Sequence, residues 1–206
     1  MNKKLIALIA MLCVVCMVFC SCGNESGTDK PNEGGNNNQQ ETSLEDVAGI
    51  LEEPVLVISA GQSADVSIAK SLLTKAGVEF TVYEDGASLD GCKSVMLVPG
   101  VSVKGLGSAG ISVEDELAAT EALIAEIEKT DAKILVAHLG GSSRRDELTD
   151  QFLDAVFPAA DCICALAEGN NKDGKFTNYA SSANIPCAIA KDIVELVNVV
   201  KTMYGK

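Results

Sequence analysis

The sequence has little of what a metal site or a hydrolytic enzyme requires. His138 is the only histidine, and the chain after Cys22 contains no Cys-x-x-Cys pair. Structural zinc sites take four Cys or His ligands, so we expect no metal. A nucleophile elbow has the pattern Gly-x-Ser-x-Gly, and Gly61-Gln62-Ser63 lacks the second glycine. These absences leave metal and Ser-His-Asp chemistry with little support.

Positive charge is also scarce. The chain has 16 Lys and Arg residues against 29 Asp and Glu residues, which gives a formal net charge of −13. An acidic protein repels phosphate backbones and anionic headgroups, so we expect neither nucleic acid nor an anionic membrane surface as a partner. The acidic residues are scattered along the chain, which is typical of solvated helix faces rather than of a cation site.

Only residues 5–19 form a long apolar run without charge. Lys3 and Lys4 precede this run, which is the layout of a secretory signal. The small Ser21 before Cys22 resembles the lipobox of bacterial lipoproteins, in which the chain is cut before the cysteine and the thiol carries lipid. We therefore predict a signal at 1–21 and lipidation of Cys22. Ordinary secretion and a retained anchor are the alternatives, although a membrane span needs roughly 20 apolar residues.

The predicted anchor places the protein at the cell membrane, facing outside the cytoplasm and touching the membrane through its lipid only. Loss of residues 1–21, which carry two lysines and no acid, would change the formal charge from −13 to −15. Residues 22–48 are polar and glycine-rich, which predicts a flexible tether. Residues 49–206 are long enough for one domain with a sizeable core.

Four cysteines lie in this predicted domain: Cys92, Cys162, Cys164 and Cys187. Cysteines of an exported domain often form disulfides. Cys162 and Cys164, however, lie two apart in an apolar strand and share one face, where they cannot easily pair. We favour buried free thiols, and a bridge from Cys187 to Cys162 or Cys164 is the alternative.

Strand and helix patterns alternate along the domain. Apolar, β-branched runs predict strands at 54–60, 78–83, 94–98, 133–138, 162–166 and 185–190. Periodic apolar stripes predict helices at 64–76, 112–129, 144–156 and 191–204. Ser63 is the expected N-cap of the first helix, and Ser112 with Asp115 forms a capping box. The predicted fold is α/β, a single doubly wound, mostly parallel sheet of about six strands, a Rossmann-like or flavodoxin-like three-layer sandwich.

Polar, glycine-bearing segments follow four of these strands. Ligands of open parallel sheets bind outside the carboxyl ends of the strands, so we predict a small anionic ligand at this edge. The candidate ligand-binding residues are Ser63, Lys104, His138, Arg144, Arg145, Glu168 and Lys172.

The spacing of Gly105, Gly107 and Gly110 matches the dinucleotide fingerprint. The motif begins several residues after its strand, the next helix begins only at Ser112, and the following strand does not end in an acidic residue. We therefore expect no dinucleotide and no other cofactor. Residues 100–111 are either a mobile loop or lid, or a loop whose Lys104 and backbone amides hold an anion.

Arg144 and Arg145 fall in the first turn of a predicted helix, where positive charge opposes the helix dipole. A bound anion would explain that placement, since the guanidinium fork fits carboxylate and phosphate. The alternative is surface pairing with the acidic residues of 146–150. His138 could act as a base, although a lone histidine at a strand end is more often packed in the core. With Gly174 at the sixth position of an EF-hand loop, Gly169 and Ala180 fall where carboxylates are needed, so we interpret residues 168–175 as turns.

Several stretches together carry a family resemblance: Glu53-Pro54-Val55-Leu56-Val57, Ser59-Ala60-Gly61-Gln62-Ser63, Lys104-Gly105-Leu106-Gly107-Ser108-Ala109-Gly110, His138-Leu139-Gly140-Gly141, Arg144-Arg145 and Asn171-Lys172-Asp173-Gly174. Over about residues 52–204 the chain resembles an uncharacterised bacterial family, a domain of unknown function found in exported proteins and lipoproteins. The resemblance implies an extracytoplasmic α/β domain and supplies no activity or catalytic residue.

Three functional hypotheses follow. The first is a lipid-anchored domain that binds a small anion and serves an envelope transport or enzyme complex. The second is an envelope hydrolase or transferase that uses His138 as a base. The third is a structural or protein-interaction module whose loops only connect strands to helices.

Overall fold

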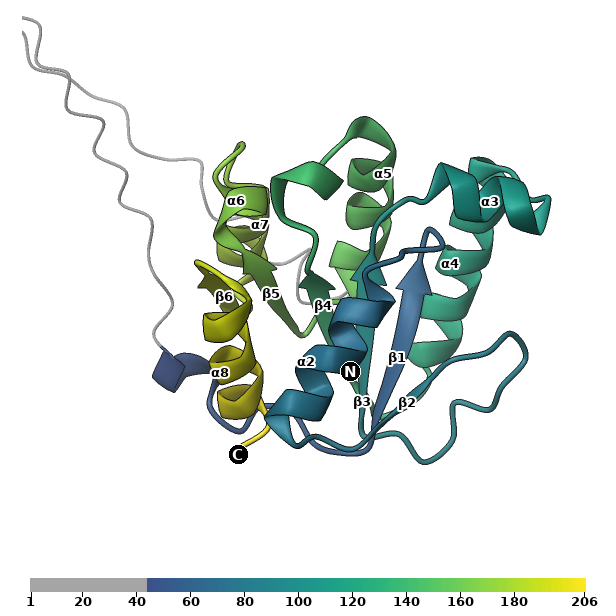
Figure 1. Cartoon of the computed structure of the whole chain (residues 1–206). Coiled ribbons are helices and arrows are strands. Elements are labelled where there is room, and N and C mark those ends of the chain that lie inside the picture. Colours follow the sequence, from purple (N-terminus) through teal and green to yellow (C-terminus); the bar gives the residue numbers. More distant parts are fainter. Residues whose placement is uncertain (1–43) are drawn as a thin grey trace, which may run out of the picture. The chain divides into compact units, whose positions relative to one another are not determined.

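The computed structural model describes residues 44–206, which form an α/β domain (Figure 1). The predicted signal at 1–21, Cys22 and the tether up to residue 43 lie outside the described residues. Six strands pair in parallel in one open sheet, which confirms the predicted fold class. The strands are β1 (Val55–Ala60), β2 (Phe80–Val82), β3 (Ser94–Pro99), β4 (Lys133–His138), β5 (Cys162–Leu166) and β6 (Cys187–Ala190).

The strand order is β2-β1-β3-β4-β5-β6. The chain moves outward from β1 to β2, crosses back to β3 on the other side of β1, and then continues to β6. The carboxyl ends of β1 and β3 therefore flank the point at which the winding reverses, where open α/β sheets bind ligands. These two strands pair in register from Val55 opposite Ser94 to Ala60 opposite Pro99. The loops that follow them consequently begin side by side.

Helices cover both faces of the sheet. The α-helices of the described residues are α2 (Val66–Ala76), α3 (Val103–Ala109), α4 (Val113–Ile127), α5 (Glu147–Val156), α6 (Ala167–Asn170), α7 (Lys175–Ala183) and α8 (Ile193–Met203). Helices α2 and α8 pack on one face, in front of the sheet in Figure 1, against Val55 and Val57 of β1. Helices α4, α5 and α7 pack on the other face, against Leu56 and Ile58. None of the helices described is both long and apolar enough to cross a membrane.

Two helix ends follow from local chemistry, and the first of them confirms the predicted capping box. The Ser112 hydroxyl accepts the N–H of Asp115 at 3.0 Å and caps α4. Gly77 ends α2 in the left-handed conformation, with φ of 71°. That conformation is inexpensive for glycine and costly for residues with a Cβ, which is why the helix stops there.

The prediction of a mobile loop at 100–111 is wrong over much of its length. Residues 103–109 form α3, whose N-cap Ser102 accepts the N–H of Gly105 at 3.1 Å. Leu106 is buried and attaches this short helix to the core. The glycines of the apparent dinucleotide motif therefore lie in a helix and at its C-cap, Gly110, rather than in a strand-to-helix turn.

The predicted helix at 144–156 starts later than expected. A short 3-10 helix, η2 (Gly141–Arg144), comes first, and α5 begins at Glu147. Asp146 caps α5 by accepting the N–H of Thr149 at 2.7 Å. Both arginines therefore precede the helix, and the dipole argument for an anion at its first turn does not apply. Residues 168–175, interpreted as turns, also contain most of α6.

The cysteines of the described domain are free, as predicted. Cys162 and Cys164 point to the face covered by α2 and α8, whereas Cys187 points to the opposite face. Burial raises the pKa of Cys162 and of Cys187 to about 12, so both thiols remain protonated at neutral pH. These side chains act as small apolar core residues.

Candidate functional site

The turn between β1 and α2 is held by its own serines. The hydroxyl of Ser59 accepts the N–H of Ser63 at 2.6 Å, and the hydroxyl of Ser63 accepts the N–H of Asp65 at 3.3 Å. Helix α2 then begins at Val66, with Asp65 in the N-cap position and without a side-chain capping bond. Ser63 is therefore not the N-cap that the sequence predicts. Its buried hydroxyl stabilises the turn that leads into the helix.

The carboxylate of Glu116, from the first turn of α4, fills this turn from the other side. Its Oε1 accepts the N–H of Gly61 at 3.3 Å and the N–H of Gln62 at 3.2 Å. The amide of Gln62 also donates to Oε2 at 3.2 Å. Gln62 has a φ of 56°, an unusual conformation for a residue with a side chain, and the Glu116 contacts offset its cost. The backbone amides that would receive an external anion after β1 thus already bind a carboxylate of the chain.

Asp65 is a buried carboxylate that is only partly compensated. The residue is 4% exposed, and its Oδ2 has no hydrogen-bond partner among the described residues. A Cβ at Gly140 would overlap this carboxylate, and a Cβ at Gly100 would come within 2.7 Å of the Ser63 hydroxyl. Loops from β1, β3 and β4 therefore meet at Asp65, and glycine allows their close approach. Burial raises the pKa of Asp65 against the opposing effect of Arg144.

Arg144 is the partner of Asp65. Its Nε lies 3.5 Å from Oδ1 of Asp65, and its side chain is 40% exposed. Within the described domain, this ion pair is the sole polar contact of the Arg144 guanidinium, so Nη1 and Nη2 have no partner. The Asp65–Arg144 pair joins the turn after β1 to η2 after β4. Asp65 contacts the Nε side of the Arg144 guanidinium, which leaves Nη1 and Nη2 without a partner in the described domain.

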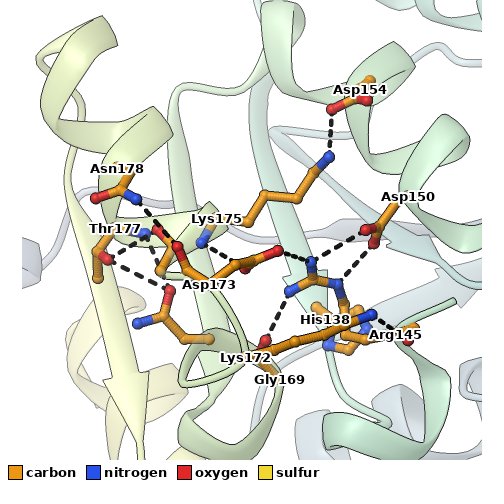
Figure 2. A network of polar contacts seen from close by, with 12 residues as sticks. His138, Arg145, Asp150, Asp154, Gly169, Lys172, Asp173, Lys175, Thr177 and Asn178 are labelled. Atoms are coloured by element: carbon orange, nitrogen blue, oxygen red, sulfur yellow. Dashed lines mark hydrogen bonds and ion pairs between the residues drawn. The ribbon is translucent and has the colours of Figure 1, made fainter. Parts of the chain in front are cut away.

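The side chain of Arg145 is fully buried, and each of its three nitrogens donates at least one hydrogen bond (Figure 2). Its Nε and Nη2 donate to the two oxygens of Asp150 at 2.6 and 3.2 Å. Nη2 also donates to Asp173 at 2.8 Å, and Nη1 donates to the carbonyl of Gly169 at 2.6 Å. Lys172 donates from Nζ to the carbonyl of Arg145 at 3.0 Å. We call these five residues the Arg145 network.

The Arg145 network connects the segments that follow β4 and β5. Burial alone would lower the pKa of Arg145, but its hydrogen bonds to Asp150 and Asp173 outweigh burial and raise that pKa. The guanidinium also lies 5.3 Å from the centre of the Phe176 ring. The side-chain nitrogens of Arg145 therefore all donate their hydrogen bonds to acceptors inside the protein. The expected pairing with an acidic residue of 146–150 is present for Arg145, although the pair is buried at the arginine.

The remaining candidates divide between the surface and the core. Lys104 is exposed on α3, and Glu168 is exposed on α6, where its carboxylate accepts the hydroxyl of Ser142 at 3.4 Å. Glu168 also lies against Gly141 of η2. Lys172 is exposed, but its Nζ is engaged with the carbonyl of Arg145 as part of the Arg145 network. Of the basic candidates, Arg144 and Lys104 are thus the two whose side-chain nitrogens are not directed into a hydrogen bond within the domain described.

His138, at the end of β4, lies fully buried. Its ring centre is 5.1 Å from that of Phe176, and Nε2 donates to the carbonyl of Arg144 at 3.4 Å. Nδ1 has no partner among residues 44–206 and lies against Gly169. Burial, the largest effect, lowers the pKa of His138 to about 4. The ring is thus neutral and packed, which gives the hypothesis of a catalytic base no support.

Three residues that shape this edge escaped the sequence analysis: Asp65, Glu116 and Gln62. Glu116 resembles any other acidic residue in the first turn of a helix. Its partner amides are 54 and 55 positions away, so their contact depends on the strand order. Asp65 follows Ser63 by two residues, and the sequence pattern favours Ser63 rather than Asp65 as the residue at the start of the helix. No local pattern distinguishes these carboxylates from solvated ones.

Comparison with known families adds one match. Residues 52–204 match a family described as "Domain of unknown function (DUF6305)". The chain belongs to the DUF6305 family. This match covers the whole sheet and every side chain of the site described above. The DUF6305 description names no ligand, reaction or cellular location. Searches of curated proteins and of solved structures returned no match.

Proposed function

We propose that this DUF6305 domain binds a small anionic ligand at the carboxyl edge of its sheet, with Arg144 as the main contact. The observation that carries the proposal is the guanidinium of Arg144, which Asp65 holds at Nε while Nη1 and Nη2 have no partner in the described domain. A fork held in this way suits carboxylate, sulfate or phosphate oxygens, which accept two parallel hydrogen bonds. Its position beside the switch point agrees with the general location of ligands in such sheets.

The proposal assigns unequal roles to the seven candidate residues. Arg144 contacts the ligand, and Lys104 adds positive charge from α3. Glu168 and Ser142 border the same edge. Ser63 shapes the turn that carries Asp65, so it acts indirectly. Arg145 and His138 support η2 from inside, and the exposed Lys172 adds a hydrogen bond to the carbonyl of Arg145.

The buried Asp65 also favours a functional interpretation over a purely structural one. A charge that is buried and only partly satisfied costs stability. A structural or interaction module whose loops only connect strands to helices does not need a buried charge that lowers its stability. Proteins retain destabilising groups mainly where function requires them. Asp65 gives Arg144 a fixed orientation, which reduces the entropy lost when a ligand binds.

We further propose that the domain is anchored through lipid on Cys22 and faces outside the cytoplasm, as part of an envelope transport or enzyme complex. The support is the sequence of residues 1–22 alone. Replacement of Cys22 by Ala should move the protein from the membrane fraction to the soluble fraction and abolish labelling with a fatty acid. Cys20→Ala is the matched control and should leave both unchanged. Membrane retention of the Cys22→Ala protein would contradict lipidation at that residue.

A thermal-shift screen with sulfate, phosphate, acetate, succinate and citrate tests the ligand proposal. At least one anion should raise the melting temperature of the wild-type domain, and Arg144→Gln should remove that response. Lys93→Gln removes an exposed positive charge just before β3, at the opposite edge of the sheet, and should keep the response. If wild type and Arg144→Gln respond alike to every anion, Arg144 is not the ligand contact.

A further inference from the structure

The Asp65–Arg144 pair places a buried acid directly behind the proposed anion contact. Arg144 Nε lies 3.5 Å from Oδ1 of Asp65, whereas Oδ2 has no partner among the described residues. The side chain of Asp65 is 5% exposed, so solvent stabilises its charge very little. The charge of Arg144 consequently favours the ionised form of this carboxylate, against the larger effect of burial, which raises its pKa. An anion on the same guanidinium would compete for that stabilisation.

We propose that anion binding at Arg144 is coupled to uptake of one proton by Asp65. This inference rests on the proposed function and adds its regulation by pH. When the anion binds Nη1 and Nη2, its negative charge lies close to Asp65, whose own burial limits how far solvent screens that charge. The proton comes from solvent and joins the Asp65 carboxylate, and no other bond is made or broken. By reciprocity, a domain in which Asp65 is already protonated binds the anion at Arg144 more tightly.

The surroundings of Asp65 supply few other charges. In the β1–α2 turn, Ser63 is uncharged. From the loops after β3 and β4, Gly100 and Gly140 contribute only backbone atoms. Glu116 lies on the far side of the turn and is engaged with Gly61 and Gln62. From α6, Glu168 contacts Gly141 and Ser142 rather than Asp65.

Two further groups lie close to Arg144 itself. His138 contacts the carbonyl of Arg144, and burial lowers the pKa of His138 to about 4, so its ring is neutral above that pH. All three side-chain nitrogens of Arg145 are hydrogen-bonded within the Arg145 network. Burial already raises the pKa of Asp65 despite Arg144, which is the condition that the coupling needs. Asp65 is thus the titratable group on which a bound anion should act most strongly.

The test measures sulfate affinity by calorimetry at roughly pH 4.5 and roughly pH 7, because sulfate keeps its charge over this range. Wild type should bind sulfate more tightly at the lower pH, by about tenfold for each unit by which bound sulfate raises the pKa of Asp65. Asp65→Asn keeps the size of the side chain and removes the titration, so its affinity should vary far less with pH. Glu147→Gln, which removes an exposed carboxylate near Arg144, should retain the wild-type dependence.

The possible outcomes separate the two proposals. Sulfate binding that depends on Arg144 but changes equally with pH in wild type and Asp65→Asn would overturn the coupling and leave the proposed function intact. Absence of Arg144-dependent sulfate binding at either pH, together with equal responses of wild type and Arg144→Gln to every anion of the thermal-shift screen, would overturn both. Calorimetry in two buffers of different ionisation enthalpy gives the proton count directly, and a count near zero at every pH from roughly 4.5 to roughly 7 would also refute the coupling. Circular dichroism of Asp65→Asn confirms that the variant is folded.

Discussion

Two adjacent arginines of this domain lie in regions of opposite character. The Arg145 network is a buried hub in which each donor group finds an acceptor from α5, α6 or the segment before α7. The Asp65–Arg144 pair has one long contact, one carboxylate oxygen without a partner and a half-exposed guanidinium. The contrast shows that charge at a sheet edge is not by itself a sign of binding. Incomplete satisfaction of a buried group is the more informative feature.

Both regions depend on η2, which begins directly after β4. Arg145 and His138 fix η2 from the side of β5, and the Asp65–Arg144 pair meets it from the side of β1. We interpret the Arg145 network as the rigid support and the Asp65–Arg144 pair as the part available for a ligand. A rigid support keeps the binding group in place at little entropic cost. The following predictions, from the largest effect to the smallest, test this division.

The same substitution at both arginines gives the largest contrast. Arg145→Gln should lower the free energy of unfolding by about 3 kcal/mol, the lower end for a buried pair, because the arginine is buried while Asp150 and Asp173 are partly exposed. Arg144→Gln should change it by less than about 1 kcal/mol, as is usual for a half-exposed ion pair. Urea denaturation monitored by circular dichroism measures both. Equal losses for the two variants would remove the distinction between the regions.

The contributions of His138 and of Asp65 to the free energy of unfolding should respond oppositely to pH. His138 has a pKa of about 4 in the fold against 6.5 for an ordinary histidine. Between these values the unfolded chain binds a proton that the folded chain does not, so this contribution to stability falls as pH falls. The loss should reach about 3 kcal/mol by pH 4. The difference between the unfolding curves of wild type and His138→Gln at several pH values isolates this effect, and a constant difference would contradict it.

Glu116 tests the β1 side of the comparison. Glu116→Ala leaves the amides of Gly61 and Gln62 without their acceptor and should cost about 2 kcal/mol of unfolding free energy. Glu114→Ala, an exposed change in the same helical turn, should cost less than about 0.5 kcal/mol. High concentrations of acetate should partly restore Glu116→Ala if the vacated amides accept an external carboxylate. Identical stabilities of the two variants would show that Glu116 does not hold this turn.

Asp65 should give the smallest change and the opposite sign. The pKa of Asp65 is raised in the fold, so its favourable contribution exists below the unfolded pKa of about 3.8 and is lost as pH rises through the folded value. Asp65→Asn should therefore stabilise the domain at neutral pH, by roughly 1 kcal/mol. Differential scanning calorimetry at pH 7 measures the change, with Asp146→Asn at the cap of α5 as a destabilising reference. A clear loss of stability in Asp65→Asn would show that the pair with Arg144 is a structural bond.

The sheet could be predicted from sequence because each strand has a recognisable local sequence pattern. Val55–Ala60 and Cys162–Leu166 are apolar runs bounded by turn residues, and Gly77 and Ser112 mark helix ends through their own chemistry. Strand order could not be read in the same way, because the link from β2 to β3 has no helix whose direction fixes the crossing. The short helix α3 could not be predicted, because Gly105 and Gly107 are poor helix formers and Leu106 is its one buried residue.

The site was predictable only in outline. The sequence places Arg144 and Arg145 at the correct edge, yet their different environments arise from the start of α5 at Glu147 and from partners 24 to 28 residues away. Arg144 meets Asp65 only because β1, β3 and β4 are neighbours in the sheet. Contacts between distant loops follow from strand order and register. A local sequence pattern contains neither, so Asp65 and Glu116 could not be distinguished from surface acids.

Arginine side-chain NMR offers the most direct test of the central claim, that Arg144 is open to an anion and Arg145 is not. The chain has two arginines, so a spectrum of Nε–H groups should contain two signals, which Arg144→Gln assigns. During a sulfate titration near pH 5, the Arg144 signal should shift progressively and saturate, while the Arg145 signal stays in place. An unmoved Arg144 signal, or an equal movement of both, would contradict the account.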